Sequence, residues 1–361
     1  MERVKNNDME RFILENQNKY LFVYSDCIPV QGKNKTAIYD LTRKDIFFIP
    51  NDYYPLFALF RSLKLGEIQK LLETKNDELQ FISLIEFLLK NELAEINNDI
   101  SQFPQIQERF EYHGMIRDAI IDIGDHIHDF HSIFRQLSEL GCLFVQIRFF
   151  KENYTLLDLS KIVRLAYHKS IFSIQLLLKY NRNISHEDYK HFYEEHADII
   201  NSIIVHSSPS DQIVKVDWNY TEDMDMYDML TREIIFSRQK INSCDKCGII
   251  DQNFIAISGV SGFMHNKQYN SCLNLKVSID IHGSIKNCPS LDMSFGNISE
   301  TSLMEVVKNP KFKEMWQIKK DNIDICKDCE LRYACSDCRA YRVAESMVSK
   351  PLKCSYKNKL I

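Results

Sequence analysis

Cysteines are the residues of this sequence whose type and spacing point most directly to chemistry. Nine of the eleven lie between Cys244 and Cys354, and only Cys27 and Cys142 precede them in the 361-residue chain. The charged N-terminus has no apolar signal segment, so we expect a cytoplasmic protein whose thiols stay reduced. Clustered thiols at short spacings in such a protein indicate metal binding rather than disulfides.

The closest spacings occur in two Cys-x-x-Cys pairs, Cys326–Cys329 and Cys335–Cys338, which Cys354 follows after a gap. Two intervening residues allow both thiolates to reach one metal centre without strain, in zinc sites and in iron–sulfur sites alike. We therefore expect the C-terminal third of the chain to fold around cysteine-bound metal.

A second set of cysteines lies upstream. Ten residues separate Cys272 from Gly283, and four separate Gly283 from Cys288. Glycine permits a tight turn that would bring these two thiols together. Cys244 and Cys247 form a third Cys-x-x-Cys pair. The alternative for these cysteines is a buried thiol without a metal, and it is strongest for Cys244 and Cys247.

Residues 1–100 predict a small unit of three strands followed by about three helices. The strands are expected at Tyr20–Tyr24, Thr36–Tyr39 and Ile46–Ile49, with a turn at Gln31–Asn34 between the first two. Apolar residues at helical spacing predict a helix at Asp77–Lys90. The residues on its apolar face are Phe81, Leu84, Ile85, Leu88 and Leu89.

Residues 110–260 alternate strand-like and helix-like segments, and repeated βα units predict a parallel sheet or a partial barrel. The first strands are expected at Ala119–Ile123 and Leu143–Ile147, with a helix between them that Gly141 ends. Later strands are expected at Ile171–Leu177, Asn201–Val205 and Phe254–Ile257. Residues 261–361 show little periodic core. The predicted fold class is therefore α/β with a cysteine-rich C-terminal domain.

Composition excludes two kinds of partner. The formal net charge is −5, which leaves no basic surface for nucleic acid. No apolar run reaches the length of about 18 residues that predicts a membrane span. The sequence also lacks the glycine-rich loops that bind nucleotides and any spacing that selects a catalytic triad, so the catalytic residues stay unknown.

The pattern from Cys272 to Cys354, with Phe295-Gly-Asn-Ile298 and Trp316 inside it, resembles the SPASM domain of radical-SAM peptide maturases. The resemblance implies two auxiliary iron–sulfur clusters, both of the [4Fe–4S] type. One cluster would use Cys326, Cys329, Cys335 and Cys354. The other would use Cys272, Cys288 and Cys338, with Cys244 or Cys247 as the variable remaining ligand. The sequence departs from the family in having two residues between Cys335 and Cys338, where three are usual.

This departure keeps a zinc hypothesis open. One zinc would be bound by Cys326, Cys329, Cys335 and Cys338, and another by Cys244, Cys247, Cys272 and Cys288. Against zinc, the five residues between Cys329 and Cys335 are far fewer than the ~15–20 of a common double Cys-x-x-Cys zinc site. Cys354 would also have no role, so iron–sulfur binding is favoured.

Residues 20–96 resemble the PqqD-like winged helix that recognises precursor peptides in ribosomal-peptide biosynthesis. Ala37-Ile-Tyr-Asp40 and the strand around Phe47 and Phe48 carry this resemblance. Such elements bind a leader peptide as an added strand beside a helix. The resemblance implies peptide contacts from a strand and a helix, namely Ile46, Phe47, Phe48 and Ile49, and Phe81, Leu84, Ile85 and Leu88. The alternative is a small α/β domain whose aromatic strand is core.

The middle region lacks the CxxxCxxC motif by which radical-SAM enzymes bind the cluster that cleaves S-adenosylmethionine. Where that loop would lie, His126, His128 and His131 offer possible metal ligands. We favour the alternative of a solvated loop with an acidic helix cap. The βα pattern therefore resembles a degenerate radical-SAM barrel, in which radical chemistry is expected to be lost.

The whole pattern resembles the SPASM-domain maturases of grasp-with-spasm systems. The resemblance implies three domains: leader recognition at 1–100, a degenerate barrel at 110–260 and a SPASM domain at 261–361. It also implies two partners, a ribosomal precursor peptide and an ATP-grasp ligase that joins Asp or Glu side chains to hydroxyl or amine side chains. Two alternatives remain: a redox or metal-dependent peptide-modifying enzyme, and a zinc-stabilised scaffold without catalysis.

Overall fold

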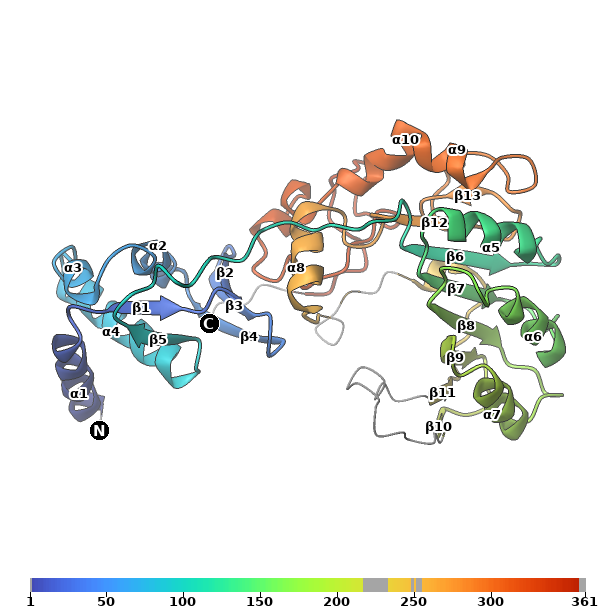
Figure 1. The fold of residues 1–361 in the computed structure, drawn as a ribbon. Coiled ribbons are helices and arrows are strands. Elements are labelled where there is room, and N and C mark those ends of the chain that lie inside the picture. Colours follow the sequence, from blue (N-terminus) through green and yellow to red (C-terminus); the bar gives the residue numbers. More distant parts are fainter. Residues whose placement is uncertain (1, 217–232, 248–249, 251–254, 357–361) are drawn as a thin grey trace.

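The computed structural model describes residues 2–216, 233–247, 250 and 255–356. An N-terminal unit of helices and short strands lies beside one large sheet, and the C-terminal segments extend from the sheet toward the N-terminal unit (Figure 1). This arrangement confirms the predicted α/β fold class. No helix of the described residues is long and apolar enough to cross a membrane.

The N-terminal unit contains two small antiparallel sheets packed with helices. One sheet has the order β2 (Cys27–Gln31), β3 (Lys35–Asp40) and β4 (Asp45–Pro50), and the other pairs β1 (Tyr20–Val23) with β5 (Ala94–Asn97). The helices are α1 (Glu2–Glu15), α2 (Leu56–Phe60), α3 (Leu65–Gln69) and α4 (Lys75–Lys90). Their shared core includes Ile38, Ile49, Phe60, Phe81 and Leu88.

This unit differs from its prediction in its strand pairing. The turn at 31–34 joins β2 to β3, so it does not join the first two predicted strands, and β1 pairs with β5 instead. Pro29 hid β2 from the sequence prediction, because proline lacks the donor that a central strand needs. The structure places β2 at a sheet edge, where proline is tolerated.

The large sheet has the order β10-β11-β9-β8-β7-β6-β12-β13. Six neighbouring strands are parallel, and β10 and β13 add antiparallel edges. The strand bounds are β6 (Asp118–Ile123), β7 (Phe144–Phe149), β8 (Ser173–Lys179), β9 (Ile200–His206), β10 (Gln212–Lys215), β11 (Glu233–Phe236), β12 (Lys276–Ile279) and β13 (Ile285–Lys286). The parallel sheet predicted from the βα repeats is thus confirmed.

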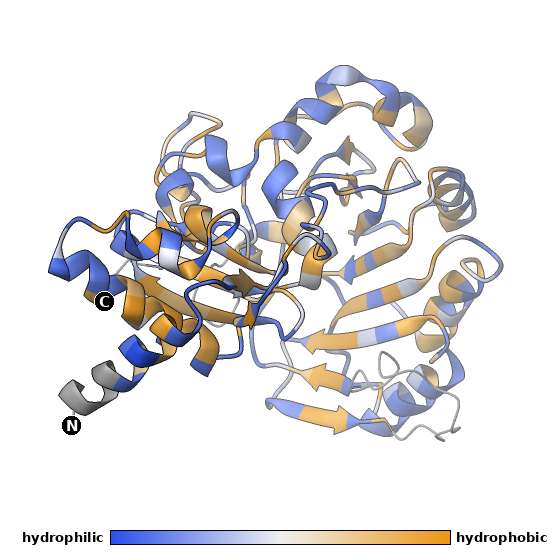
Figure 2. Cartoon of the chain, turned by 60° about the vertical axis from the view of Figure 1, so that its left-hand side comes forward, coloured by the Kyte–Doolittle hydropathy of each residue, from blue (hydrophilic) through white to orange (hydrophobic). Residues whose placement is uncertain are grey.

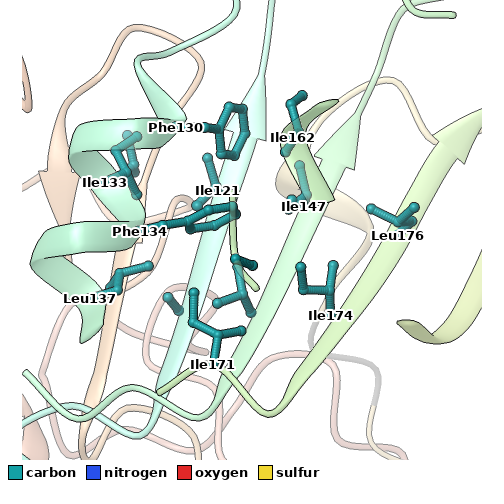
Figure 3. Close-up of a cluster of buried hydrophobic side chains, with 14 of the residues drawn as sticks. Ile121, Phe130, Ile133, Phe134, Leu137, Ile147, Ile162, Ile171, Ile174 and Leu176 are labelled. Carbon is teal, nitrogen blue, oxygen red and sulfur yellow. The ribbon is translucent and has the colours of Figure 1, made fainter. Parts of the chain in front are cut away.

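Helices α5 (Phe130–Glu139), α6 (Leu156–Arg164) and α7 (His186–Glu195) cover one face of this sheet (Figure 1). Phe130 and Phe134 of α5 point onto Ile121 and Ile147 of the strands (Figure 3). Burying each such side chain stabilises the fold by about 1.5–3 kcal/mol. The coloured cartoon shows apolar residues concentrated on the strands and on the helix faces toward them (Figure 2).

The C-terminal region is built into the large sheet rather than beside it. β12 pairs in parallel with β6, so one sheet continues across the boundary predicted at residue 260. Residues 255–257 form no strand, which corrects the strand predicted at 254–257, and Phe254 lies outside the described residues. The remaining helices are short: α8 (Gly259–Gln268), α9 (Leu303–Lys308) and α10 (Pro310–Lys313).

Candidate metal centres

All eleven cysteines lie in the described residues, and none of them forms a disulfide. Cys27 and Cys142 are buried singly in two different apolar cores. Burial raises the pKa of the Cys27 thiol to about 12 and also raises the pKa of Cys142. Both are therefore unreactive core residues, and the other nine cysteines carry the chemistry.

Cys326, Cys329, Cys335 and Cys354 form what we call the downstream group. A 3-10 turn at Cys326–Asp328 holds the first pair, and the Cys329 N–H donates to the Cys326 carbonyl over 3.0 Å. Burial, against the opposing effect of Lys320 and with smaller contributions from Asp337, Cys335 and Cys354, raises the pKa of Cys326 to about 11. Cys354, distant in sequence, thus lies within electrostatic range of Cys326 and Cys335, and Cys329 lies within range of the same two thiols.

Cys272, Cys288 and Cys338 form the core of an upstream group. The hairpin of β12 and β13 brings Cys272 and Cys288 together, as predicted, and turns through Gly283 at φ +81°. A Cβ at Gly283 would lie 2.9 Å from Asn297 Oδ1, so the turn requires glycine. Burial raises the pKa of Cys272, and the charges of Cys247 and Cys338 add to that effect.

The Cys244–Cys247 loop packs against this upstream group. Ser290 Oγ donates to the Cys244 carbonyl over 3.1 Å, and Lys353 Nζ donates to the Cys247 carbonyl over 2.7 Å. Burial raises the pKa of Cys288 to about 12, and the charges of Cys272 and Cys247 contribute. Cys247 thus acts on both Cys272 and Cys288, which completes a group of four thiols.

This grouping differs from the one that the zinc hypothesis requires. The zinc hypothesis groups Cys338 with Cys326, Cys329 and Cys335, whereas the charge of Cys338 acts on Cys272 of the upstream group. It brings Cys354 near Cys326 and Cys335 instead. Among the described residues, no three His, Cys, Asp or Glu side chains are arranged to hold a single metal ion.

The donor set of both groups fits iron–sulfur clusters, whose irons are bound by four cysteine thiolates. The thiols are largely desolvated, and burial raises the pKa of Cys329 to about 12. Such thiols lose their protons only when a metal or another positive charge compensates the thiolate. The structure supplies part of this compensation from two lysines.

Each thiol group has a lysine ammonium beside it. Lys320 is only 2% exposed, and its Nζ lies 3.6 Å from Cys335 Sγ. Lys276, partly buried at the start of β12, places Nζ 3.7 Å from Cys272 Sγ. Burial lowers the pKa of both lysines, but nearby acidic groups raise it overall, chiefly Cys272 and Asp118 at Lys276 and Cys335 and Asp337 at Lys320.

The downstream group is also the contact point for the N-terminal unit. Glu330, fully buried directly after Cys329, accepts a hydrogen bond at its carbonyl from Tyr39 Oη of β3 over 2.8 Å. The Lys33 N–H donates to the Asp328 carbonyl over 2.7 Å. A Cβ at Gly32 would lie 2.7 Å from the Glu330 nitrogen, so only glycine permits this approach. The β2–β3 hairpin therefore packs directly on the Cys326–Cys329 loop.

The predicted peptide-binding strand β4 lies at the edge of its sheet and pairs only with β3 among the described residues. Its side chains alternate as expected. Phe47 packs toward the core, and its ring centre lies 6.2 Å from the ring centre of Phe87 in α4. Phe48 is 38% exposed, with Lys35 Nζ 3.8 Å from its ring centre. The N–H of Ile46 bonds to its neighbour Asp45 Oδ1 over 2.8 Å.

The predicted contacts on the neighbouring helix need correction. Phe81, Leu84, Ile85 and Leu88 are completely buried in the core of the N-terminal unit, so they cannot touch a bound peptide. The same apolar periodicity that predicts the helix selects the face that the core covers. Phe87 of α4 contacts β4 through Phe47, and helical spacing puts the partly or fully exposed Gln80 and Ser83 on the same face of the helix.

The loop that contains His126, His128 and His131 has the structure that we favoured, a loop with an acidic helix cap. Asp129 caps α5, and its side chain accepts from the Ser132 N–H over 3.1 Å. His126 and His131 are exposed. His128 Nε2 bonds inward to the carbonyls of Asp122 and Asp280, at 3.0 and 3.1 Å. The loop is thus an acidic helix cap with one structural histidine.

Sequence reasoning missed several charged residues. Asp122 and Arg148, on neighbouring strands of the large sheet, form a buried bidentate ion pair at 2.5 and 2.8 Å. Burial raises the pKa of Asp122 against the opposing effect of Arg148. Glu330 and Lys320 are as deeply buried. The position of Glu330 directly after Cys329 is a sequence signal that could have pointed to one of these residues.

Comparison with known protein families identifies one domain. Residues 272–330 match the model of the SPASM iron–sulfur cluster-binding domain, which confirms the predicted resemblance over this segment. The matched segment contains Cys272, Cys288, Cys326 and Cys329, while Cys335, Cys338 and Cys354 follow it. No curated protein matches the sequence.

Two solved structures are similar to the chain over nearly its whole length. One is the crystal structure of Streptococcus suis SuiB, with 12% identity and a TM-score of 0.35 over 94% of this chain and 99% of the other. The second is SuiB bound to precursor peptide SuiA, with 11% identity and a TM-score of 0.34 over 93% and 100%. At such low TM-scores, the alignments assign no role to any residue of this chain.

Proposed function

We propose that this protein takes part in the maturation of a ribosomally made peptide, as an iron–sulfur protein that binds the precursor's leader for a partner ligase. The observation that carries the proposal is the pair of four-thiol groups in and around a SPASM segment. In this proposal the protein is cytoplasmic, and its domains are leader recognition at 1–100, a degenerate barrel at 110–260 and a SPASM domain at 261–361.

The proposed ligands follow the two groups. Cys326, Cys329, Cys335 and Cys354 bind one [4Fe–4S] cluster. Cys272, Cys288 and Cys338 bind the other, and Cys247 rather than Cys244 is the fourth ligand because its charge acts on Cys272 and Cys288. Bound clusters would supply one-electron redox capacity and would hold the C-terminal segments together.

Four thiols in each group suffice to bind all four irons of a [4Fe–4S] cluster, which leaves no iron with an open coordination position. This complete ligation favours a recognition role without catalysis. An enzyme acting through a cluster iron would need an open coordination position, as catalytic metal sites do. Radical cleavage of S-adenosylmethionine is not part of the proposal, because the CxxxCxxC motif is missing from the sequence. Bond formation is assigned to the partner, an ATP-grasp ligase.

The partner ligase would form each bond in two steps. The ligase transfers the γ-phosphoryl group of ATP to an Asp or Glu side chain of the precursor, which releases ADP and forms an acyl phosphate. A hydroxyl or amine side chain then attacks the acyl carbon and releases inorganic phosphate and a proton. The precursor loses one water molecule for each bond, so the reaction is visible as a mass decrease of the peptide.

The free edge of β4 is the proposed binding site for the leader. Its backbone groups are unpaired on one side among the described residues, so an extended peptide can add as a fourth strand. The Ile46 N–H bonds to a side chain rather than to β3, which places it on the outer edge. Phe48 lies two residues on and therefore presents its N–H to the same edge.

Leader binding to the full chain tests this proposal. A fluorescent leader peptide of the precursor is titrated against wild type, Phe48→Pro and Phe48→Ala, with iron content as the control for folding. Proline removes the outward donor, so we expect at least tenfold weaker binding, whereas alanine keeps the N–H and should bind more tightly than proline does. Unchanged binding to Phe48→Pro with normal iron content would contradict the assignment of the β4 edge.

A further inference from the structure

Lys320 and Lys276 each lie against one thiol group, although neither belongs to a cysteine motif. Lys320 comes from a 3-10 turn at Lys320–Asn322, and its Nζ also donates to the Ser336 carbonyl over 3.2 Å. Lys276 begins β12 of the large sheet. Burying an ammonium is unfavourable unless nearby negative charge compensates it. The compensating charge at both lysines must therefore come from their immediate surroundings.

The carboxylate nearest Lys320 does not fully neutralise the positive charge of this lysine. Asp337 Oδ1 lies 3.5 Å from Lys320 Nζ, but Asp337 is already paired with Arg339 at 2.6 and 2.8 Å. Asn270 also donates to Asp337 over 2.7 Å. Lys320 and Arg339 thus share one carboxylate, so these three residues keep one net positive charge beside Cys335.

The upstream lysine has the same arrangement. Asp118 lies opposite Lys276 in the β6–β12 pairing, but its carboxylate is bonded to Arg117 Nε at 2.9 Å. Lys276 still acts most strongly on Cys272, whose Sγ lies 3.7 Å from Nζ, then on Asp118, and less on Cys288 and Cys247. Two unrelated elements thus place one lysine ammonium beside each thiol group.

We propose that Lys320 and Lys276 are positioning residues that set the reduction potentials of the two clusters, one lysine for each cluster. The inference rests on the proposed iron–sulfur occupancy. Reduction adds one electron to a cluster whose thiolate ligands already make it negative, so a fixed ammonium beside a ligand sulfur stabilises the reduced form. Net charge and hydrogen bonds to sulfur are known determinants of such potentials. In a desolvated site, solvent screens this interaction only weakly.

The test is an anaerobic titration of the full chain with dithionite, followed by electron paramagnetic resonance. Lys320→Met should lower the midpoint potential of the downstream cluster, and Lys276→Met should lower that of the upstream cluster. We expect at least a tenfold fall in the equilibrium constant for reduction, which is about 59 mV for a one-electron couple. Lys320→Arg and Lys276→Arg keep the charge and should keep the potentials near wild type.

Each lysine variant serves as the control for the other, because each should shift only one of the two midpoints. Unchanged midpoints in both methionine variants at normal iron and sulfide content would overturn the inference while leaving the proposed function intact. A wild-type protein without sulfide would overturn both. If Lys320→Met loses its cluster, Lys276→Met decides the inference: a lowered upstream midpoint supports it, and an unchanged one contradicts it.

Discussion

The two thiol groups differ in how the chain assembles them. Three of the four downstream thiols lie within ten residues, from Cys326 to Cys335, on a loop that packs against the N-terminal hairpin. The upstream thiols come from four separate segments, and the β12–β13 hairpin of the large sheet brings two of them together. The downstream group is therefore mainly local in sequence, whereas the upstream group depends on the completed sheet.

This difference predicts unequal effects when each cluster is removed. Cys326→Ser should lose the downstream cluster, loosen the contact of Glu330 with Tyr39 and weaken leader binding as well. Cys288→Ser should lose only the upstream cluster and leave leader binding near wild type. Iron analysis and the leader titration measure both effects. Equal loss of leader binding in the two variants would show that the groups are not separated in this way.

A matched pair of variants tests which cysteine is the fourth ligand of the upstream cluster. Cys247→Ser should remove the upstream cluster or convert it to a form with fewer irons, because it deletes the fourth thiolate. Cys244→Ser should retain it, since Cys247 is the thiol of this pair whose charge acts on both Cys272 and Cys288. Iron content and the paramagnetic resonance spectrum distinguish the two. The reverse pattern would assign Cys244 as the ligand.

A smaller effect is expected at the contact between the downstream loop and the hairpin. Tyr39→Phe removes a buried hydrogen bond and leaves the Glu330 carbonyl without this donor, which should lower the free energy of unfolding by about 1–2 kcal/mol. Tyr54→Phe deletes the same atom at a site that is 36% exposed and serves as the control. Chemical denaturation under anaerobic conditions measures both. Equal stability of the two variants would mean that the contact contributes little.

The parallel sheet was predictable because its strands are continuous apolar runs separated by helices with clear ends. Gly141 at φ +75° and the Asp129 cap follow directly from local residue preferences. β2 and β5 were not predictable from propensity, because Pro29 masks the first and tertiary pairing with β1 creates the second.

The thiol groups were predictable in outline, since cysteine spacing reports directly on metal binding. The lysines beside them were not, because a lysine four residues from a cysteine, or six before one, is ordinary in sequence. The helix residues Phe81 and Leu84 illustrate a second limit. Periodicity identified the apolar face of α4 correctly, but that face turns toward the core, and α4 contacts β4 through Phe87.

The central claim is that Cys354, rather than Cys338, completes the downstream iron–sulfur site. The most direct test measures iron, acid-labile sulfide and zinc in anaerobically purified wild type and Cys354→Ser. The account predicts roughly eight irons with matching sulfide in wild type, for two [4Fe–4S] clusters, and loss of about half in Cys354→Ser. Stoichiometric zinc without sulfide, retained in full by Cys354→Ser, would contradict it.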